Sequence, residues 1–168
     1  MSQPTEQSPL IWLTAGAHEK LKAELENLKG PVREEIVTRI SEARDEGDLK
    51  ENGGYHAARE EQGKNEGNIR TLEHTLLKAV TDPAEDDGVV AVGKVITYKF
   101  EGDDDDEAES FHLGARENED YVDVDVYSAA APLGEALLGA RKGDTVAFVA
   151  PTGKTLQVVV VDATPYAD

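Results

Sequence analysis

Two narrow apolar stripes with helical spacing run through the first half of the chain and restrict what it can fold into. In the later stripe the residues recur at alternating steps of four and three, which is an uninterrupted heptad repeat. The earlier stripe contains consecutive steps of four, a stutter in the same repeat. The stripes consist of Leu21, Leu25, Leu28, Val32, Ile36, Ile40 and Ala43, and of Ala58, Gln62, Asn65, Ile69, Leu72, Leu76 and Ala79. Neither stripe is wide enough to be buried by itself, so their pairing predicts an antiparallel helical hairpin.

We expect this coiled-coil hairpin to occupy residues 14–80. Folding the chain back near Lys50 aligns the two stripes, and roughly 30 residues per arm give a length on the order of 45 Å. Thr14 is a suitable N-cap for the first helix. Gly30–Pro31 predicts a kink or a restart of that helix, because proline fits a first turn but not a helix interior.

The second half of the chain changes to strand spacing. Its segments rich in Val, Thr, Tyr and Phe, separated by Gly, Asp or Pro clusters, predict a small, mostly antiparallel sheet. These segments are Val89–Val92, Lys94–Phe100, Ser110–Leu113, Tyr121–Tyr127, Thr145–Val149 and Thr155–Val161. A short helix is expected over Pro132–Gly139, with proline in its first turn. The fold class is therefore α+β, with a tail at residues 1–13, a linker at 81–88 and a globular domain at 89–168.

Composition excludes several classes of function. The chain has no cysteine, which excludes disulfides, thiolate metal sites and cysteine nucleophiles. Its net charge of −18 repels nucleic-acid phosphates, so autonomous DNA binding is disfavoured. The acidic excess is concentrated in residues 81–168, with 20 acidic against 6 basic residues, compared with 15 against 11 in residues 1–80. Without a signal-peptide pattern or a long apolar run, we expect a cytoplasmic protein with no membrane partner.

The turn of the hairpin, residues 44–56, contains four carboxylates. A solvated acidic turn is the simplest interpretation, since charged tips are common. However, Asp48 and Glu51 are three residues apart, so in a helical turn they could share one cation. Mg²⁺ often binds one or two carboxylates and takes its other ligands from a substrate or water. Two acids alone cannot complete such a site, which suggests a group that is delivered into the active site of another molecule.

The segment from Asp48–Leu49–Lys50–Glu51–Asn52 through Gly63 strongly resembles the signature of the bacterial Gre transcript-cleavage factors, GreA type. The resemblance covers nearly the whole chain, from Trp12–Leu13–Thr14 through the segment 132–139 to the closing strand. It implies an N-terminal coiled-coil hairpin and an FKBP-like C-terminal domain.

The resemblance also implies a function and a set of site residues. Such factors bind bacterial RNA polymerase in its secondary channel and stimulate cleavage of the backtracked nascent RNA at its 3′ end. Asp48 and Glu51 match the acids that help to hold a catalytic Mg²⁺ shared with the polymerase, and Arg44 and Arg59 match arginines suited to RNA phosphates. Pro132 and Leu133 match the region that contacts the polymerase. The expected protein is a monomeric accessory factor and not itself an enzyme.

Two other classes of function compete with this interpretation. One is a regulator that occupies the secondary channel and modulates transcription without cleavage; the presence of both Asp48 and Glu51 favours the cleavage factor. The other is an independent enzyme, either a metal hydrolase or a prolyl isomerase. A metal hydrolase is disfavoured because no further cluster of metal ligands accompanies the two tip acids. A prolyl isomerase is not supported either, because a resemblance in fold alone does not imply that activity. Tyr55 and His56 are expected to pack locally rather than to take part in catalysis.

Overall fold

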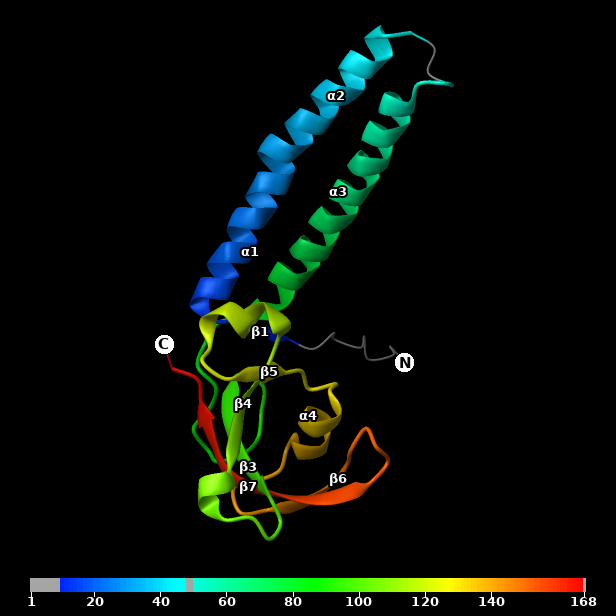
Figure 1. Ribbon diagram of the computed structural model, residues 1–168. Coiled ribbons are helices and arrows are strands. Elements are labelled where there is room, and N and C mark those ends of the chain that lie inside the picture. The colour runs from blue at the N-terminus through cyan, green and yellow to red at the C-terminus, as the bar shows by residue number, and fades with distance from the viewer. Residues whose placement is uncertain (1–9, 48–49, 168) are drawn as a thin grey trace, which may run out of the picture. The chain divides into compact units, whose positions relative to one another are not determined.

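The computed structural model describes residues 10–47 and 50–167 (Figure 1). Residues 18–78 form one compact unit. The described residues on either side of them, 10–17 and 79–167, form the other unit. Within these described ranges, none of the helices combines the length and the apolar character needed to cross a membrane.

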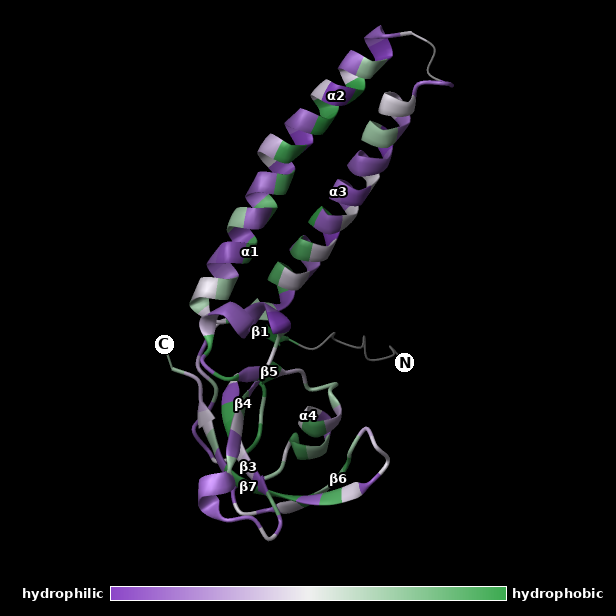
Figure 2. Ribbon diagram, viewed as in Figure 1, coloured by the Kyte–Doolittle hydropathy of each residue, from purple (hydrophilic) through white to green (hydrophobic). Residues whose placement is uncertain are grey.

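The first unit is the expected antiparallel hairpin. Helix α1 (Ala15–Asn27) continues through a π-helical segment, η1 (Leu28–Val32), into α2 (Arg33–Asp45), and α3 (Gly53–Lys78) returns beside them. The buried residues Ile36, Ile40 and Ala58 pack together between α2 and α3, with Val32 and Tyr55 against them. Figure 2 shows hydrophilic and hydrophobic positions alternating along both arms, as a two-helix seam requires.

The stutter in the earlier stripe coincides with the π-helical segment. Of the expected kink or restart at Gly30–Pro31, the restart is wrong, because Asn27, Val32 and Arg33 all keep α-helical dihedral angles. A π turn closes its hydrogen bond over one more residue than an α turn. The wider turn therefore absorbs the additional residue of the stutter and keeps the stripe facing the second arm.

A tail was expected over residues 1–13, of which residues 1–9 lie outside the described residues. Within that range Ile11–Leu13 belong instead to the globular unit. Strand β1 (Ile11–Trp12) pairs in parallel with β2 (Ala79–Val80), and Trp12 and Leu13 are buried. The expected linker is also attached to this unit, since the Trp12 indole nitrogen donates to the Asp82 carbonyl at 2.7 Å. Burial of the large Trp and Leu side chains favours this docking over a solvated tail.

Thr14 caps the first helix as predicted. Its Oγ1 accepts a hydrogen bond from the Ala17 backbone N–H at 3.1 Å. Its own N–H donates to Asn118 Oδ1 at 2.9 Å. The start of α1 is therefore held both by a local cap and by a residue 104 positions away in the sequence.

The globular unit has a five-stranded sheet in the order β5-β4-β3-β7-β6. Its strands are β3 (Lys94–Phe100), β4 (Glu109–Leu113), β5 (Asp125–Tyr127), β6 (Thr145–Val149) and β7 (Thr155–Pro165). All neighbours are antiparallel except β4 and β5, and helix α4 (Pro132–Leu137) contributes Leu137 to the core. The mostly antiparallel sheet with one α-helix packed on its core is as expected.

One expected strand was wrong, and another is shorter than expected. Val89–Val92 forms only an isolated bridge between Val89 and Arg141. In the alternating segment 121–127 only β5 is a strand, because residues 116–121 form a 3₁₀ helix, η3. This helix places Asn118 in the interior, and the Tyr121 carbonyl accepts a hydrogen bond from the Tyr166 hydroxyl at 2.7 Å. Contacts distant in the sequence therefore override the alternation. A second 3₁₀ helix, η2 (Asp105–Glu107), lies between β3 and β4.

His112 on β4 is a fully buried histidine at the centre of the contacts that hold residues 12–14. Its ring lies 5.3 Å from that of Trp12 and 5.9 Å from that of Tyr166. Asn118 Nδ2 lies 3.1 Å from His112 Nε2 and also donates to the Trp12 carbonyl. Because Asn118 Oδ1 accepts from Thr14, its amino group faces the ring, and Nε2 must be an unprotonated acceptor. Burial lowers the pKa of His112, with the Lys94 backbone opposing part of that shift.

The buried neutral histidine predicts that the globular unit loses stability in mild acid. With its pKa lowered by folding, His112 contributes stability fully above its unfolded pKa of about 6.5, and this contribution decreases as the pH falls below that value. The loss can reach about 1.4 kcal/mol per pH unit. We expect denaturant unfolding, followed by the fluorescence of the single tryptophan, to show this decrease between about pH 6.5 and 5.

His112→Gln should flatten this pH dependence, while His74→Gln, at an exposed position of α3, should not change it. Paired carboxylates such as Asp87, whose pKa is lowered by the hydrogen bond from Lys94, also contribute stability that is lost in acid, but that loss begins only near their unfolded pKa of about 4. A wild-type stability that is constant from pH 7.5 to 5 would contradict the assignment.

Candidate functional site

The tip of the hairpin joins α2 to α3 and contains Glu51, one of the two predicted catalytic and metal-associated acids. Glu51 is exposed, as are Arg44 at the end of α2 and Arg59 on α3. The other predicted acid, Asp48, lies outside the described residues. The structure thus brings one acid and both predicted RNA-contacting arginines to the same end of the hairpin.

Asn52 organises the described part of the tip. This role of Asn52 was not predicted from the sequence. Its Oδ1 accepts a hydrogen bond from the Tyr55 N–H at 3.0 Å, and so caps α3. Its Nδ2 donates to the Ala43 carbonyl at 2.6 Å, near the end of α2. One side chain therefore closes both helix ends beside Glu51. The sequence signal was an asparagine immediately before a helix, which favours an N-cap.

Tyr55 and His56 pack locally, as expected. Tyr55 is half-buried against the apolar residues between α2 and α3, and the His56 ring lies 5.6 Å from the Tyr55 ring. His56 Nε2 is 3.2 Å from the Lys50 carbonyl. These contacts attach Lys50, in the turn, to the first residues of α3.

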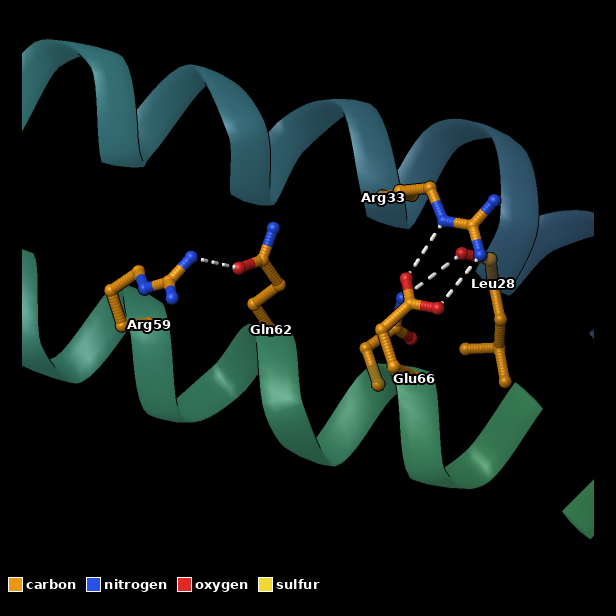
Figure 3. A network of polar contacts seen from close by, with 6 residues as sticks. Leu28, Arg33, Arg59, Gln62 and Glu66 are labelled. Carbon is orange, nitrogen blue, oxygen red and sulfur yellow. Dashed lines mark hydrogen bonds and ion pairs between the residues drawn. The ribbon is translucent and has the colours of Figure 1, made fainter. Parts of the chain in front are cut away.

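The two arginines are held without a carboxylate partner within the described part of the chain. The Arg44 guanidinium lies 6.0 Å from the centre of the Tyr55 ring, within cation–π range. Arg59 Nη1 donates to Gln62 Oε1 at 2.8 Å along the same helix (Figure 3). Neither contact neutralises the charge, so both guanidinium groups can bind an anion.

A second candidate surface lies on the globular unit at the start of α4, where Pro132 and Leu133 were predicted to contact the polymerase. They line a groove of about 320 Å³ together with Tyr98, Phe100, Tyr127, Ala131, Phe148 and Pro151. Pro132 is exposed, and Leu133 is half-buried with part of its side chain against the core. The aromatic lining was not predicted from the sequence, because its residues come from three different strands and meet only in the folded sheet.

The carboxylate of Glu109 borders this aromatic groove. The Tyr98 hydroxyl donates to Glu109 Oε2 at 2.8 Å. Burial, and then the hydrogen bond to Glu109, raise the pKa of Tyr98, so its phenol stays neutral. The groove therefore offers aromatic and aliphatic surface beside negative charge, which suits an apolar side chain on a basic partner.

Removal of the Asn52 side chain should loosen the tip. Asn52→Ala loses both the cap and the bond to Ala43, and a lost N-cap costs about 1 kcal/mol. We expect faster amide hydrogen exchange in the first turn of α3, measured by NMR or mass spectrometry.

Asn52→Asp separates the two contacts, because aspartate still accepts from Tyr55 but cannot donate to the Ala43 carbonyl. This variant should retain protection in the first turn of α3 and lose it only at the end of α2. Equal exchange in Asn52→Ala and wild type would mean that Asn52 does not organise the tip.

Comparison with known proteins finds matches along the whole chain. Residues 11–80 match the family described as transcription elongation factor, N-terminal, and residues 85–165 match transcription elongation factor, GreA/GreB, C-term. The transcription elongation factor GreA of Saccharopolyspora erythraea is 47% identical over 161 residues, covering 95% of this chain and 98% of that protein. The protein of the same name from Mycobacterium tuberculosis is 44% identical, covering 94% and 96%.

Among solved structures, the GreA factor homolog 1 (Gfh1) of Thermus thermophilus is 26% identical and aligns with a TM-score of 0.40, covering 92% of this chain and 98% of that chain. The two family matches cover both units, and the relatives are similar over nearly their full length. This chain therefore belongs to the GreA/GreB family of transcription elongation factors.

Proposed function

We propose that this protein binds bacterial RNA polymerase through the secondary channel and stimulates Mg²⁺-dependent cleavage of backtracked nascent RNA. The proposal rests on the acidic tip: in a member of the GreA/GreB family, Asp48 and Glu51 lie in the sequence between the two helical arms, and Glu51 is exposed there. The polymerase and the 3′ end of its nascent RNA are the partners of a monomeric, cytoplasmic factor.

The chemistry of the tip residues fits this role. The exposed carboxylate of Glu51 is an oxygen donor of the kind that Mg²⁺ prefers, and Asp48 would be the second. A Mg²⁺ shared with the polymerase active centre would act as a Lewis acid and lower the pKa of a bound water. The two acids would orient that water, while Arg44 and Arg59 bind phosphates of the extruded RNA.

The same residues argue that the protein is an accessory factor and not an independent enzyme. Two tip acids leave most coordination positions to be filled by another molecule. Hydrolysis would therefore depend on ligands that the polymerase supplies.

We assign the polymerase contact to the aromatic groove around Pro132 and Leu133. An apolar side chain of the polymerase would enter the groove, and the acidic surroundings would favour a basic segment beside it. The net negative charge of residues 81–168, with 20 acidic against 6 basic side chains, also favours a basic partner. Docking and catalysis are thus placed on different units of the chain.

The first prediction of this assignment concerns the acids. Asp48→Asn and Glu51→Gln preserve side-chain size but remove the negative charge that holds a metal. Each should reduce stimulated cleavage on stalled, backtracked complexes by about a hundredfold or more, since several kcal/mol of transition-state stabilisation are lost. Raised Mg²⁺ should restore part of the activity. Purified wild-type protein without polymerase should leave RNA intact.

Both acid variants should keep wild-type affinity for polymerase and compete with the wild-type factor as inhibitors. Full stimulation by the Asp48→Asn, Glu51→Gln double variant would identify the tip as a solvated turn. A wild-type protein that binds polymerase and inhibits it without cleavage would instead establish the non-cleaving regulator.

A separate prediction concerns docking. Leu133→Asp places a charge in the aromatic groove and should weaken polymerase binding by about tenfold or more, as for a central interface residue. Leu138→Asp is the matched control, because Leu138 is 48% exposed just after α4 and does not line the groove. Affinities from biolayer interferometry and circular dichroism spectra should be measured together. Unchanged affinity of a folded Leu133→Asp variant would remove the groove from the interface.

A further inference from the structure

The apolar seam of the hairpin contains a buried asparagine. Asn65 on α3 is 6% exposed, in a position where the heptad repeat favours an apolar residue. Its Nδ2 donates to the Leu28 carbonyl at 3.1 Å, across the seam. Leu28 is the first residue of the π-helical segment, the one such segment among the described helices of the hairpin. A polar side chain of α3 is thus bonded to an irregular turn of the other arm.

Ion pairs surround this contact. Arg33 bonds Glu66 through Nε and Nη2, both at 2.9 Å, next to Leu28 (Figure 3). Arg39 pairs with Glu61 at 2.7 Å further along the arms. These side chains are more than a third exposed, so their pairing energy is small. Exposed pairs can also exchange partners, because acidic residues recur along both arms.

Asn65 has a stronger effect on register than these ion pairs. If one arm slid along the other by a helical turn, the repeating stripe would bury another set of apolar residues. Exposed charges would find new partners, but the Asn65 amide would lose the Leu28 carbonyl and remain buried without a partner, which is costly. A buried asparagine in a coiled coil is known to specify register in this way.

We propose that Asn65 is a positioning residue for the tip: by bonding the Leu28 carbonyl it fixes the register of the two arms and hence the place of Glu51 relative to the end of α2. A slide of one turn corresponds to about 5.4 Å along the helix axis. An error of about 1 Å in the position of a catalytic group can reduce a rate by a hundredfold. The catalytic consequence rests on the proposed cleavage function, whereas the register does not.

The register can be measured directly, because the chain has no cysteine of its own. Ser41→Cys on α2 and Lys64→Cys on α3 introduce two exposed sites for nitroxide labels. Pulsed electron paramagnetic resonance on the full chain should give a single narrow distance for this parent. Asn65→Leu should add a second distance population or displace the distribution by several ångströms.

Gln62→Leu is the matched control. Gln62 is the other polar residue of the same stripe, but it accepts a hydrogen bond from Arg59 on its own helix and, among the described residues, makes no hydrogen bond to the other arm. This variant should keep the single parent distance. Asn65→Ala, which adds no volume, provides a second test if Asn65→Leu does not fold. An unchanged distance distribution in the folded Asn65 variants would overturn the proposal.

Measurements of thermal stability and of cleavage distinguish a positioning role of Asn65 from one in which it only stabilises the hairpin. Asn65→Leu should melt at or above the parent temperature, bind polymerase normally and stimulate cleavage about tenfold less. A lower melting temperature with an unchanged distance would mean that Asn65 only stabilises the hairpin, and would overturn the proposal. If the parent protein itself does not stimulate cleavage, the proposed function fails, while the distance measurement still decides the register.

Discussion

The mutual burial of two narrow apolar stripes is the constraint on which the hairpin depends. Neither arm can bury its stripe in water alone, and exposed ion pairs contribute too little to replace that burial. Ile36 and Ile40 on one arm and Ala58 on the other pack together toward the tip, with Tyr55 against them. Because the seam extends this far, the end of α2 and the start of α3 lie close enough for Asn52 to bond both.

Three asparagine side chains form hydrogen bonds at positions where apolar packing alone does not select one arrangement. Asn52 caps α3 and bonds the Ala43 carbonyl, and Asn65 bonds the Leu28 carbonyl. In the globular unit, Asn118 bonds Thr14, Trp12 and His112. An amide can donate and accept at the same time, so it pairs with backbone groups without adding a buried charge. Apolar burial stabilises these units, and the amides select one arrangement.

Much of the fold was predictable because its signals are local. Residue spacing predicted the hairpin, and capping chemistry predicted the role of Thr14. Strand composition predicted β3 and β6 with the same bounds as in the structure. Two of the errors arise from contact between residues distant in sequence. Ile11–Leu13 joined the globular unit through Ala79–Val80, and the alternating segment 121–127 was shortened by η3 and its contact with Tyr166. At Gly30–Pro31, where a kink or a restart had been expected, the cause is local, because a wider turn of the same helix accommodates both residues.

The sequence by itself determined the hairpin, the position of Glu51 at its turn and the place of Pro132 and Leu133 at the start of a short helix. These features depend on spacing along one segment, which is visible in one dimension. Only the tertiary structure decided that Tyr98, Phe100, Tyr127 and Phe148 complete a groove beside Pro132, and that Asn65 meets the carbonyl of Leu28. Such contacts depend on sheet order and on the register of the arms, and both are set by packing between residues that the sequence keeps far apart.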